Sequence, residues 1–232
     1  MRQYIRISVF AVIALVSVLA QGRMTDAQTA EITEKFFTNA PAQAMPLLSK
    51  NARLDMLDYY RNGLSTPTVN ELKGRSRITG MSPHSIDVQI SDSTALQFVL
   101  VEPSRFLPDY YIMVVETVST PVPDSSIRAF DTDWNEMPVE LPDYTSFIPK
   151  DKRKLTKTMD EPPLTFTEIR FDPEKKTFTF RDRSKEGYYK GDTPEILAYF
   201  LPEIELKPRI ALKDKKSWNI FDTFAHDRII FR

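Results

Sequence analysis

The stretch SIDVQISDSTALQFVLV, residues 85–101, decides the fold of this chain. Its first part alternates apolar and polar residues between Ile86 and Ile90, and this period of two is typical of a half-buried β-strand. The letters SDST at residues 91–94 predict a turn, after which residues 95–101 predict a second strand. Because so short a turn joins antiparallel neighbours, the middle of the chain predicts an antiparallel sheet.

More strands follow this hairpin. YYIMVVETV, residues 110–118, is apolar on both faces as far as Glu116, which is typical of a central strand covered on both sides. SSIRAFD, residues 125–131, follows after one short loop. Closely spaced strands of this kind predict an antiparallel β-meander.

Two helices are predicted before the sheet. DAQTAEITEKFFTNAP, residues 26–41, has apolar residues at helical spacing and stops at its proline. A second helix is predicted within residues 44–63, with Asn51 as N-cap and Gly63 just past its end. Its residues predicted to face the core are Leu54, Leu57 and Tyr60. These helices and the meander form a predicted first unit at residues 24–137.

Residues 138–163 contain repeated prolines and a basic cluster at residues 150–157, which predict a connector running over the surface. Beyond it, TFTEIRFDPEKKTFTFRDR predicts a hairpin that turns at Asp172-Pro173. Asp192 is predicted to cap a short helix at residues 193–200, and RIALK, SWNIF and RIIFR read as strands. The prediction is an α+β fold: N-terminal helices, an antiparallel meander, a Pro-rich connector, and a second β-rich unit with one helix at residues 164–232.

Residues 1–20 have the pattern of a signal peptide. A basic start is followed by the uncharged run at residues 7–20, which is shorter than the roughly 20 residues that a membrane-spanning helix needs. We predict export, most simply to the periplasm, with cleavage after Ala20 and no stable membrane span afterwards. The alternative ends of the peptide are Gly22 and Ala27, and an uncleaved N-terminal anchor stays open as the other interpretation.

Composition excludes several function classes. The 31 basic and 32 acidic side chains create no overall field that would draw nucleic acid. None of the 6 glycines lies in a phosphate-binding arrangement, so neither a nucleotide nor another cofactor is predicted. The absence of cysteine excludes disulfides, thiolate zinc sites, a cysteine nucleophile and a lipoprotein anchor.

The stretch IRAFDTDWNEMP, residues 127–138, resembles a calcium loop at first sight. Asp131, Asp133 and Asn135 alternate as calcium ligands do, but Glu136 and Pro142 stand where an EF-hand needs glycine and a bidentate glutamate. Asx side chains gather in hairpin turns because they bond to nearby backbone. We therefore predict a turn and no metal site.

No catalytic residue is predicted. The two histidines, His84 and His226, lie far apart in the sequence, and no motif completes a triad around either. Asp55 and Asp58 share one face of the second helix and are flanked by arginines, which predicts an ion-paired surface.

Aromatic residues offer the candidate binding surface. Six of the 9 tyrosines occur as doublets, and neighbouring residues of a strand point to opposite faces, so one ring of residues 110–111 should be buried and the other free. If the free rings converge, they form an amphipathic surface suited to a sugar or a protein; otherwise they complete the core. The candidate binding residues are Tyr59, Tyr110, Trp134 and Tyr188.

Three stretches carry a family resemblance: FFTNAPAQAMPLLSKNARLDMLDYYRNG at residues 36–63, VNELKGRSRI at residues 69–78 and DSSIRAFDTDWNEM at residues 124–137. They resemble an uncharacterised family of exported Bacteroidetes proteins, known only as a domain of unknown function. The likeness extends to SWNIF near the C-terminus. It implies a Gram-negative envelope setting and brings no known activity and no known site residues.

Two functions remain open. The first is an exported, non-catalytic protein that binds or scaffolds an envelope protein or glycan. The alternative is a hydrolase of a cell-wall or polysaccharide substrate, with a carboxylate pair that the fold assembles from distant strands. Two acids facing each other across a cleft would favour the enzyme, whereas an open sheet edge or an exposed aromatic patch would favour binding.

Overall fold

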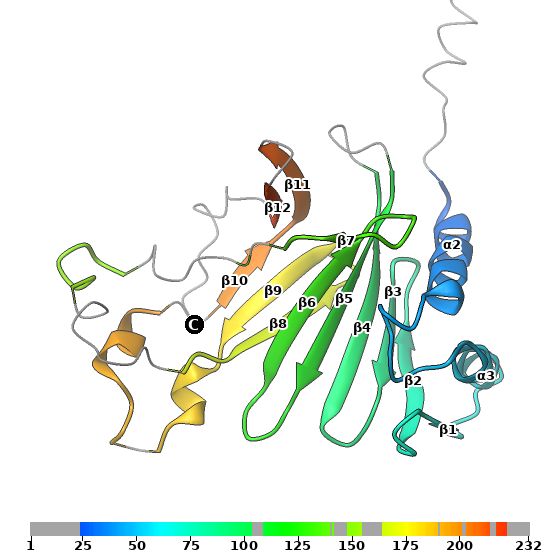
Figure 1. Ribbon diagram of the computed structural model, residues 1–232, viewed down its shortest axis with the longest axis horizontal. Helices are drawn as coiled ribbons and strands as arrows, with labels where there is room; N and C mark the ends of the chain where they lie inside the picture. The colour runs from blue at the N-terminus through cyan, green and yellow to red at the C-terminus, as the bar shows by residue number, and fades with distance from the viewer. Residues whose placement is uncertain are drawn as a thin grey trace, which may run out of the picture.

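The computed structural model describes residues 24–103, 109–139, 141, 148–154, 164–189, 191–200, 203–213 and 217–221, with side chains up to residue 208 (Figure 1). The predicted signal peptide, His226 and the RIIFR strand lie outside these residues. Within the described part of the chain, no helix combines the length and the apolar character that crossing a membrane requires. The chain contains helices and antiparallel sheets, so the predicted α+β class is confirmed.

The larger sheet contains seven strands that are ordered as they follow along the chain, so the predicted meander is confirmed. Its strands are β1 (Thr68–Val69), β2 (Arg75–Met81), β3 (Ser85–Gln89), β4 (Thr94–Val101), β5 (Tyr111–Val118), β6 (Asp124–Phe130) and β7 (Glu136–Met137). The 3-stranded sheet has the order β10-β9-β8, from β8 (Thr167–Asp172), β9 (Thr177–Asp182) and β10 (Glu203–Leu206). The pair β11 (Pro208–Lys213) and β12 (Ser217–Phe221) confirms that RIALK and SWNIF are strands.

The two helices are α2 (Asp26–Asn39) and α3 (Lys50–Arg61). The N-cap of α3 is Ser49 rather than the predicted Asn51, and the Ser49 hydroxyl accepts a hydrogen bond from the Ala52 N–H. Gly63 follows the helix with φ +66°, as predicted, a conformation that glycine adopts without strain.

The buried face of α3 also differs from the prediction. Leu57 is buried, but Leu54 is 45% exposed and Tyr60 is 38% exposed. The buried residues of the helix are Ala52, Arg53, Met56 and Leu57. Arg53 sets this orientation, because its buried guanidinium donates to the carbonyls of Thr38 (3.2 Å) and Ala40 (2.6 Å) at the C-terminal end of α2. Burial lowers the pKa of Arg53.

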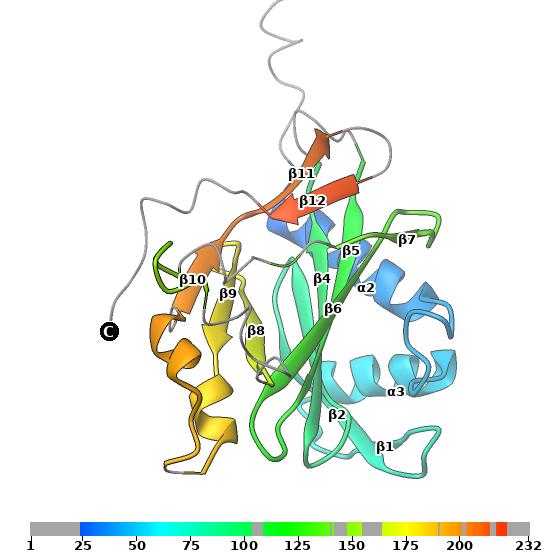
Figure 2. The ribbon, with the colours of Figure 1, turned by 60° about the vertical axis from the view of Figure 1, so that its left-hand side comes forward.

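The larger sheet is covered on both faces. Figure 2 shows α2 and α3 on one side of it and the 3-stranded sheet on the other. The helix side packs Phe37, Met56 and Phe98 into one core. The opposite side packs Val99 and Met113 against phenylalanines of β8 and β9 in a second core. Residues 111–115 of β5 are buried throughout, which confirms the central strand with two covered faces.

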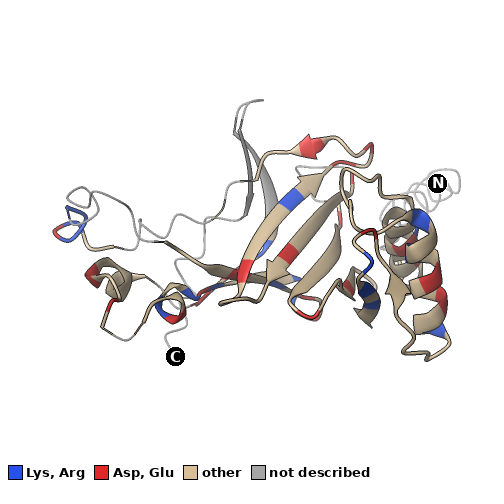
Figure 3. Cartoon of the chain, turned by 60° about the horizontal axis from the view of Figure 1, so that its bottom comes forward, with Lys and Arg blue, Asp and Glu red and all other residues tan. Residues whose placement is uncertain are grey.

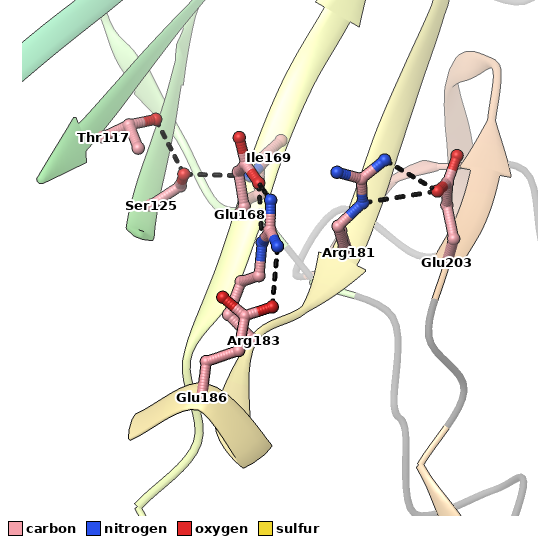
Figure 4. Close-up of polar contacts among 8 residues, drawn as sticks. All are labelled: Thr117, Ser125, Glu168, Ile169, Arg181, Arg183, Glu186 and Glu203. Carbon is pink, nitrogen blue, oxygen red and sulfur yellow. Dashed lines mark hydrogen bonds and ion pairs between the residues drawn. The ribbon is translucent and has the colours of Figure 1, made fainter. Parts of the chain in front are cut away.

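Side chains of the larger sheet seal the outer edge of β8. Asp124 Oδ1 accepts from the Thr167 N–H (3.0 Å), and Ser125 Oγ accepts from the Ile169 N–H (2.9 Å). Gln97 Oε1 accepts from the Phe171 N–H (2.8 Å). Figure 4 shows Ser125 between Thr117 and the backbone of Ile169. The alternate N–H groups of this edge strand are therefore satisfied without another strand.

The residues after the predicted connector confirm the hairpin and correct the predicted cap of the short helix. Asp172 Oδ1 accepts from the N–H groups at positions 174 and 175 in the β8–β9 turn, as the Asp-Pro pair predicts. The short helix is a 3-10 helix, η3 (Glu195–Tyr199), which follows Pro194 and has no side-chain cap, so Asp192 does not cap it.

Ile148, within the predicted surface connector, is buried against Ile196. A short 3-10 turn, η2 (Ser184–Gly187), follows β9.

Candidate functional site

The stretch that resembles a calcium loop is a turn between β6 and β7. Asp131 Oδ1 accepts from the N–H groups of Asp133 (2.9 Å) and Asn135 (2.8 Å), and its Oδ2 accepts from the Asn135 side chain (2.8 Å). The Asp131 carboxylate thus bonds the turn's own backbone, and the predicted turn is confirmed. Among the described residues, no group of three or more histidine or acidic side chains is placed to hold a metal ion.

The four predicted aromatic binding residues do not converge. Trp134 is half-buried, with ring centroids 5.8 Å from Phe130, 6.2 Å from Phe36 and 6.4 Å from Phe98. Tyr110 is half-buried beside the same core, and its hydroxyl donates to the sulfur of Met24.

Tyr188 directly follows η2, and its hydroxyl donates to the Leu164 carbonyl (3.1 Å). Its doublet neighbour Tyr189 is exposed. In the strand doublet, Tyr111 is buried and Tyr110 is half-buried, as the alternation of strand residues predicts. Burial raises the pKa of Tyr111.

Tyr59 lines a groove between the C-terminal end of α3 and β2, which we call the edge groove. It has a volume of about 580 Å³. Its walls are Met56, Tyr59 and Tyr60 of α3, residues 63–66 of the following loop, and residues 77–79 of β2. In Figure 1, α3 lies beside β1 and β2 at the helix-covered end of the sheet.

The end of α3 shapes the edge groove. Gly63 reverses the chain, and the Leu64 N–H then donates to the Tyr59 carbonyl (2.8 Å). This turn holds Leu64, which is 52% exposed, next to the partly exposed ring of Tyr60. Buried Met56 forms part of the groove lining. The groove therefore offers apolar and aromatic surface to an incoming group.

The edge groove runs along a free strand edge. β1 pairs with β2 at residues 75 and 76. From residue 77 to residue 81, β2 pairs with β3 on one side, and no strand of the described chain pairs with it on the other. The register shifts between Ile78 and Gly80, a bulge that shortens the regular part of this edge. An open edge presents unpaired N–H and C=O groups that can pair with another chain.

A second groove, polar in character, tests the hydrolase alternative. It has a volume of about 380 Å³ and lies between the β3–β4 hairpin and β8, with Asp87 and Glu168 among its lining residues. The Gln97 side chain donates to Asp87 (2.9 Å), and Arg183 donates twice to Glu168 (2.6 and 2.8 Å; Figure 4). Both carboxylates are thus held by side chains of this chain, whereas a glycosidase needs two acids that face a substrate across a cleft. The polar groove therefore gives the hydrolase little support.

His84 occupies a third, smaller cavity. The cavity has a volume of about 200 Å³ and includes Phe171 and Lys176 of the β8–β9 hairpin. His84 is buried, and its Nε2 lies 3.8 Å from Glu102 Oε1, beyond hydrogen-bond distance. Burial lowers the pKa of His84, and the nearby charge of Lys176 lowers it further. The His84 backbone N–H donates to the Ser82 hydroxyl (3.2 Å), but none of the described hydrogen bonds joins the His84 imidazole to a hydroxyl.

The acidic pair on α3 lies on the surface, as predicted. Asp55 and Asp58 are both exposed. Arg61 forms an ion pair with Glu34 of α2 rather than with either aspartate, so the pairing itself differs from the prediction. Figure 3 shows acidic and basic residues interspersed over the helices and strands, in keeping with the nearly balanced charge.

Comparison with known proteins identifies a family and a fold. The profile of a family described as "Protein of unknown function (DUF3256)" matches residues 25–207. A solved structure of a domain of an uncharacterized protein from Porphyromonas gingivalis W83 covers 82% of this chain and 97% of its own, with 18% identity and a TM-score of 0.58. At this identity the likeness concerns the fold. No curated protein matches the chain.

Proposed function

The chain belongs to this family of proteins of unknown function, and we propose that it is an exported, non-catalytic binding protein of the cell envelope. In this proposal an extended segment of an envelope protein adds as a further strand to the free edge of β2. The basic start and uncharged run of residues 1–20 support export, and the periplasm is the simplest destination.

One observation carries the proposal: an unpaired strand edge and an apolar groove coincide at residues 77–79. In strand addition, backbone hydrogen bonds supply affinity and pockets for alternate side chains supply specificity. The open edge of β2 offers the backbone groups, and the edge groove offers the pocket lined by Tyr59, Tyr60 and Leu64. Both parts of this recognition mode are therefore present in one place.

The test is affinity purification from envelope extracts with the tagged protein and two matched variants. Leu64→Asp places a charge in the edge groove. Leu164→Asp makes the same change at a leucine that is 70% exposed, contacts Tyr188 and does not line the groove. Because both leucines are exposed, each variant should remain folded, with a free energy of unfolding within about 0.5 kcal/mol of the unchanged protein.

We expect a protein partner to be retained by the unchanged protein and by Leu164→Asp, and lost with Leu64→Asp. Equal recovery by all three proteins would place the contact elsewhere and overturn the proposal. Recovery of glycans or of small products in place of a protein would favour the hydrolase.

A further inference from the structure

We infer that the segment bound at β2 alternates acidic and apolar side chains; this inference rests on the proposed strand addition. The alternation of β2 itself carries the argument. Arg75, Arg77 and Thr79 are exposed, whereas Ser76 and Ile78 between them are buried. A strand that pairs with this edge alternates in the same way, so its side chains divide between the same two faces.

One face of the added strand meets unpaired positive charge. Arg77, on the free part of the edge, points away from the helices, since Ile78 on the opposite face belongs to the core beneath α3. Arg75 points the same way but already pairs with Val69 of β1, so it lies beside the added strand rather than opposite it. Within the described chain, neither arginine forms an ion pair or a side-chain hydrogen bond. Opposite charges across neighbouring strands are stabilising, so acidic side chains fit this face.

The other face of the added strand meets the edge groove. Ile78 lies on this face, and the aromatic and aliphatic side chains of α3 and its following loop extend the surface outward. An apolar side chain entering there buries its surface against Tyr59, Tyr60 and Leu64. Acidic residues on one face and apolar residues on the other give the bound segment a period of two.

Charge also argues against a second copy of this chain as the occupant. Two β2 edges paired with each other over residues 77–81 would bring the Arg77 side chains of both copies onto the same face, and like charges across strands are destabilising. If the C-terminal residues RIIFR of a chain occupied the edge instead, they would likewise bring arginines next to Arg77. The bulge at residues 78–80 further limits regular pairing to a short segment. A short acidic–apolar segment of another protein therefore fits best.

The test compares two fluorescent hexapeptides, one alternating valine and glutamate and one alternating valine and lysine, by fluorescence anisotropy with the purified protein. We expect the glutamate peptide to bind several-fold more tightly, because its contact with Arg77, and with Arg75 beside it, changes from repulsive to attractive. The double variant Arg75→Glu with Arg77→Glu should reverse this preference. The control Lys154→Glu with Lys185→Glu changes the net charge equally at two other exposed positions and should keep it.

The outcomes separate this inference from the proposed function. One outcome is equal binding of both peptides at β2, as mapped by changes in the amide signals of residues 77–81. That result would support strand addition at β2 but overturn the inference that the bound segment is acidic. If neither peptide binds, the proposed strand addition itself fails. If sedimentation shows a dimer that the Arg75→Glu and Arg77→Glu variant disrupts, the occupant is a second copy and the inference is overturned.

Discussion

The strands β8 and β2 each have an outer edge with no neighbouring strand. The two edges differ in whether side chains form hydrogen bonds with the free backbone groups. At β8, Asp124, Ser125 and Gln97 accept hydrogen bonds from three alternate N–H groups. At residues 77–81 of β2, the described chain supplies no such strand or side-chain cover. One sheet edge is sealed by side chains, and the other is open beside an apolar groove.

The difference suggests a use for the open edge. Exposed strand edges favour uncontrolled pairing, and proteins protect them with charged residues and bulges. The β2 edge has both devices, in Arg77 and in the bulge before Gly80. These devices discourage pairing with a second copy but still permit a short strand of opposite charge. The sealed edge of β8 shows that this fold can cover an edge completely.

The largest expected effect comes from breaking the core behind the sealed edge. Phe178 is fully buried, and its ring centroid lies 5.0 Å from that of Phe171 in β8. Phe178→Ala should lower the free energy of unfolding by about 3–5 kcal/mol, because it leaves a cavity between the two sheets. Urea denaturation followed by tryptophan fluorescence measures this change. A loss below about 1 kcal/mol would mean that the 3-stranded sheet contributes little to the stability of the larger one.

Unsealing the β8 edge should have a smaller effect. Gln97→Ala removes the acceptor of the Phe171 N–H and should lower the free energy of unfolding by about 1–3 kcal/mol. Gln89→Ala is the matched control, because Gln89 lies on the same face and its side chain makes no hydrogen bond within the described chain. If both variants lose the same free energy of unfolding, the hydrogen bond from the Phe171 N–H to Gln97 does not contribute to stability.

The free energy of unfolding should also depend on pH through His84, which lines one cavity with Phe171 of β8. Burial and Lys176 lower the pKa of His84 below its ordinary value of 6.5, while Glu102 and Asp26 oppose the shift. Below pH 6.5 the unfolded chain therefore takes up a proton more readily than the folded protein, so stability falls as the pH falls through the pKa of folded His84. The free energy of unfolding should be steady at higher pH and decrease toward pH 5.

The variant His84→Gln removes this proton uptake and isolates its contribution. The decrease between pH 6.5 and pH 5 should be smaller in the variant than in the unchanged protein, as measured by urea denaturation at a series of pH values. An identical decrease in both proteins would assign the pH dependence to other groups.

Much of the fold could be predicted from the sequence because its signals are local. The alternation at residues 86–90 and the all-apolar stretch of β5 identified the central hairpins and the strand with two covered faces. The edge strand β2 was missed because its sequence RSRITGM is mostly polar and lacks a clear alternation of apolar and polar residues. The short strands β1, β7 and β10 and the bulge of β2 were missed because they depend on pairing with partners elsewhere. The N-cap of α3 was placed two residues late because Ser49 and Asn51 are both good caps.

The candidate site could be predicted only in part. Tyr59 was identified as a candidate, but the groove around it exists because β1 ends after two residues and leaves β2 uncovered. The partners of the sealed edge are similarly remote, since Gln97 and Phe171 are 74 positions apart. Contacts of this kind depend on how two sheets pack and leave no local pattern in the sequence.

Hydrogen exchange of single backbone amides, measured by NMR, tests the contrast between the two edges most directly. We predict slow exchange for the N–H groups of Thr167, Ile169 and Phe171, and fast exchange for those amides of residues 77–81 that face away from β3. The glutamate peptide should slow the second group and leave the first unchanged. Slow exchange of the outward β2 amides in the free protein would show that this edge is already covered, and would contradict the account.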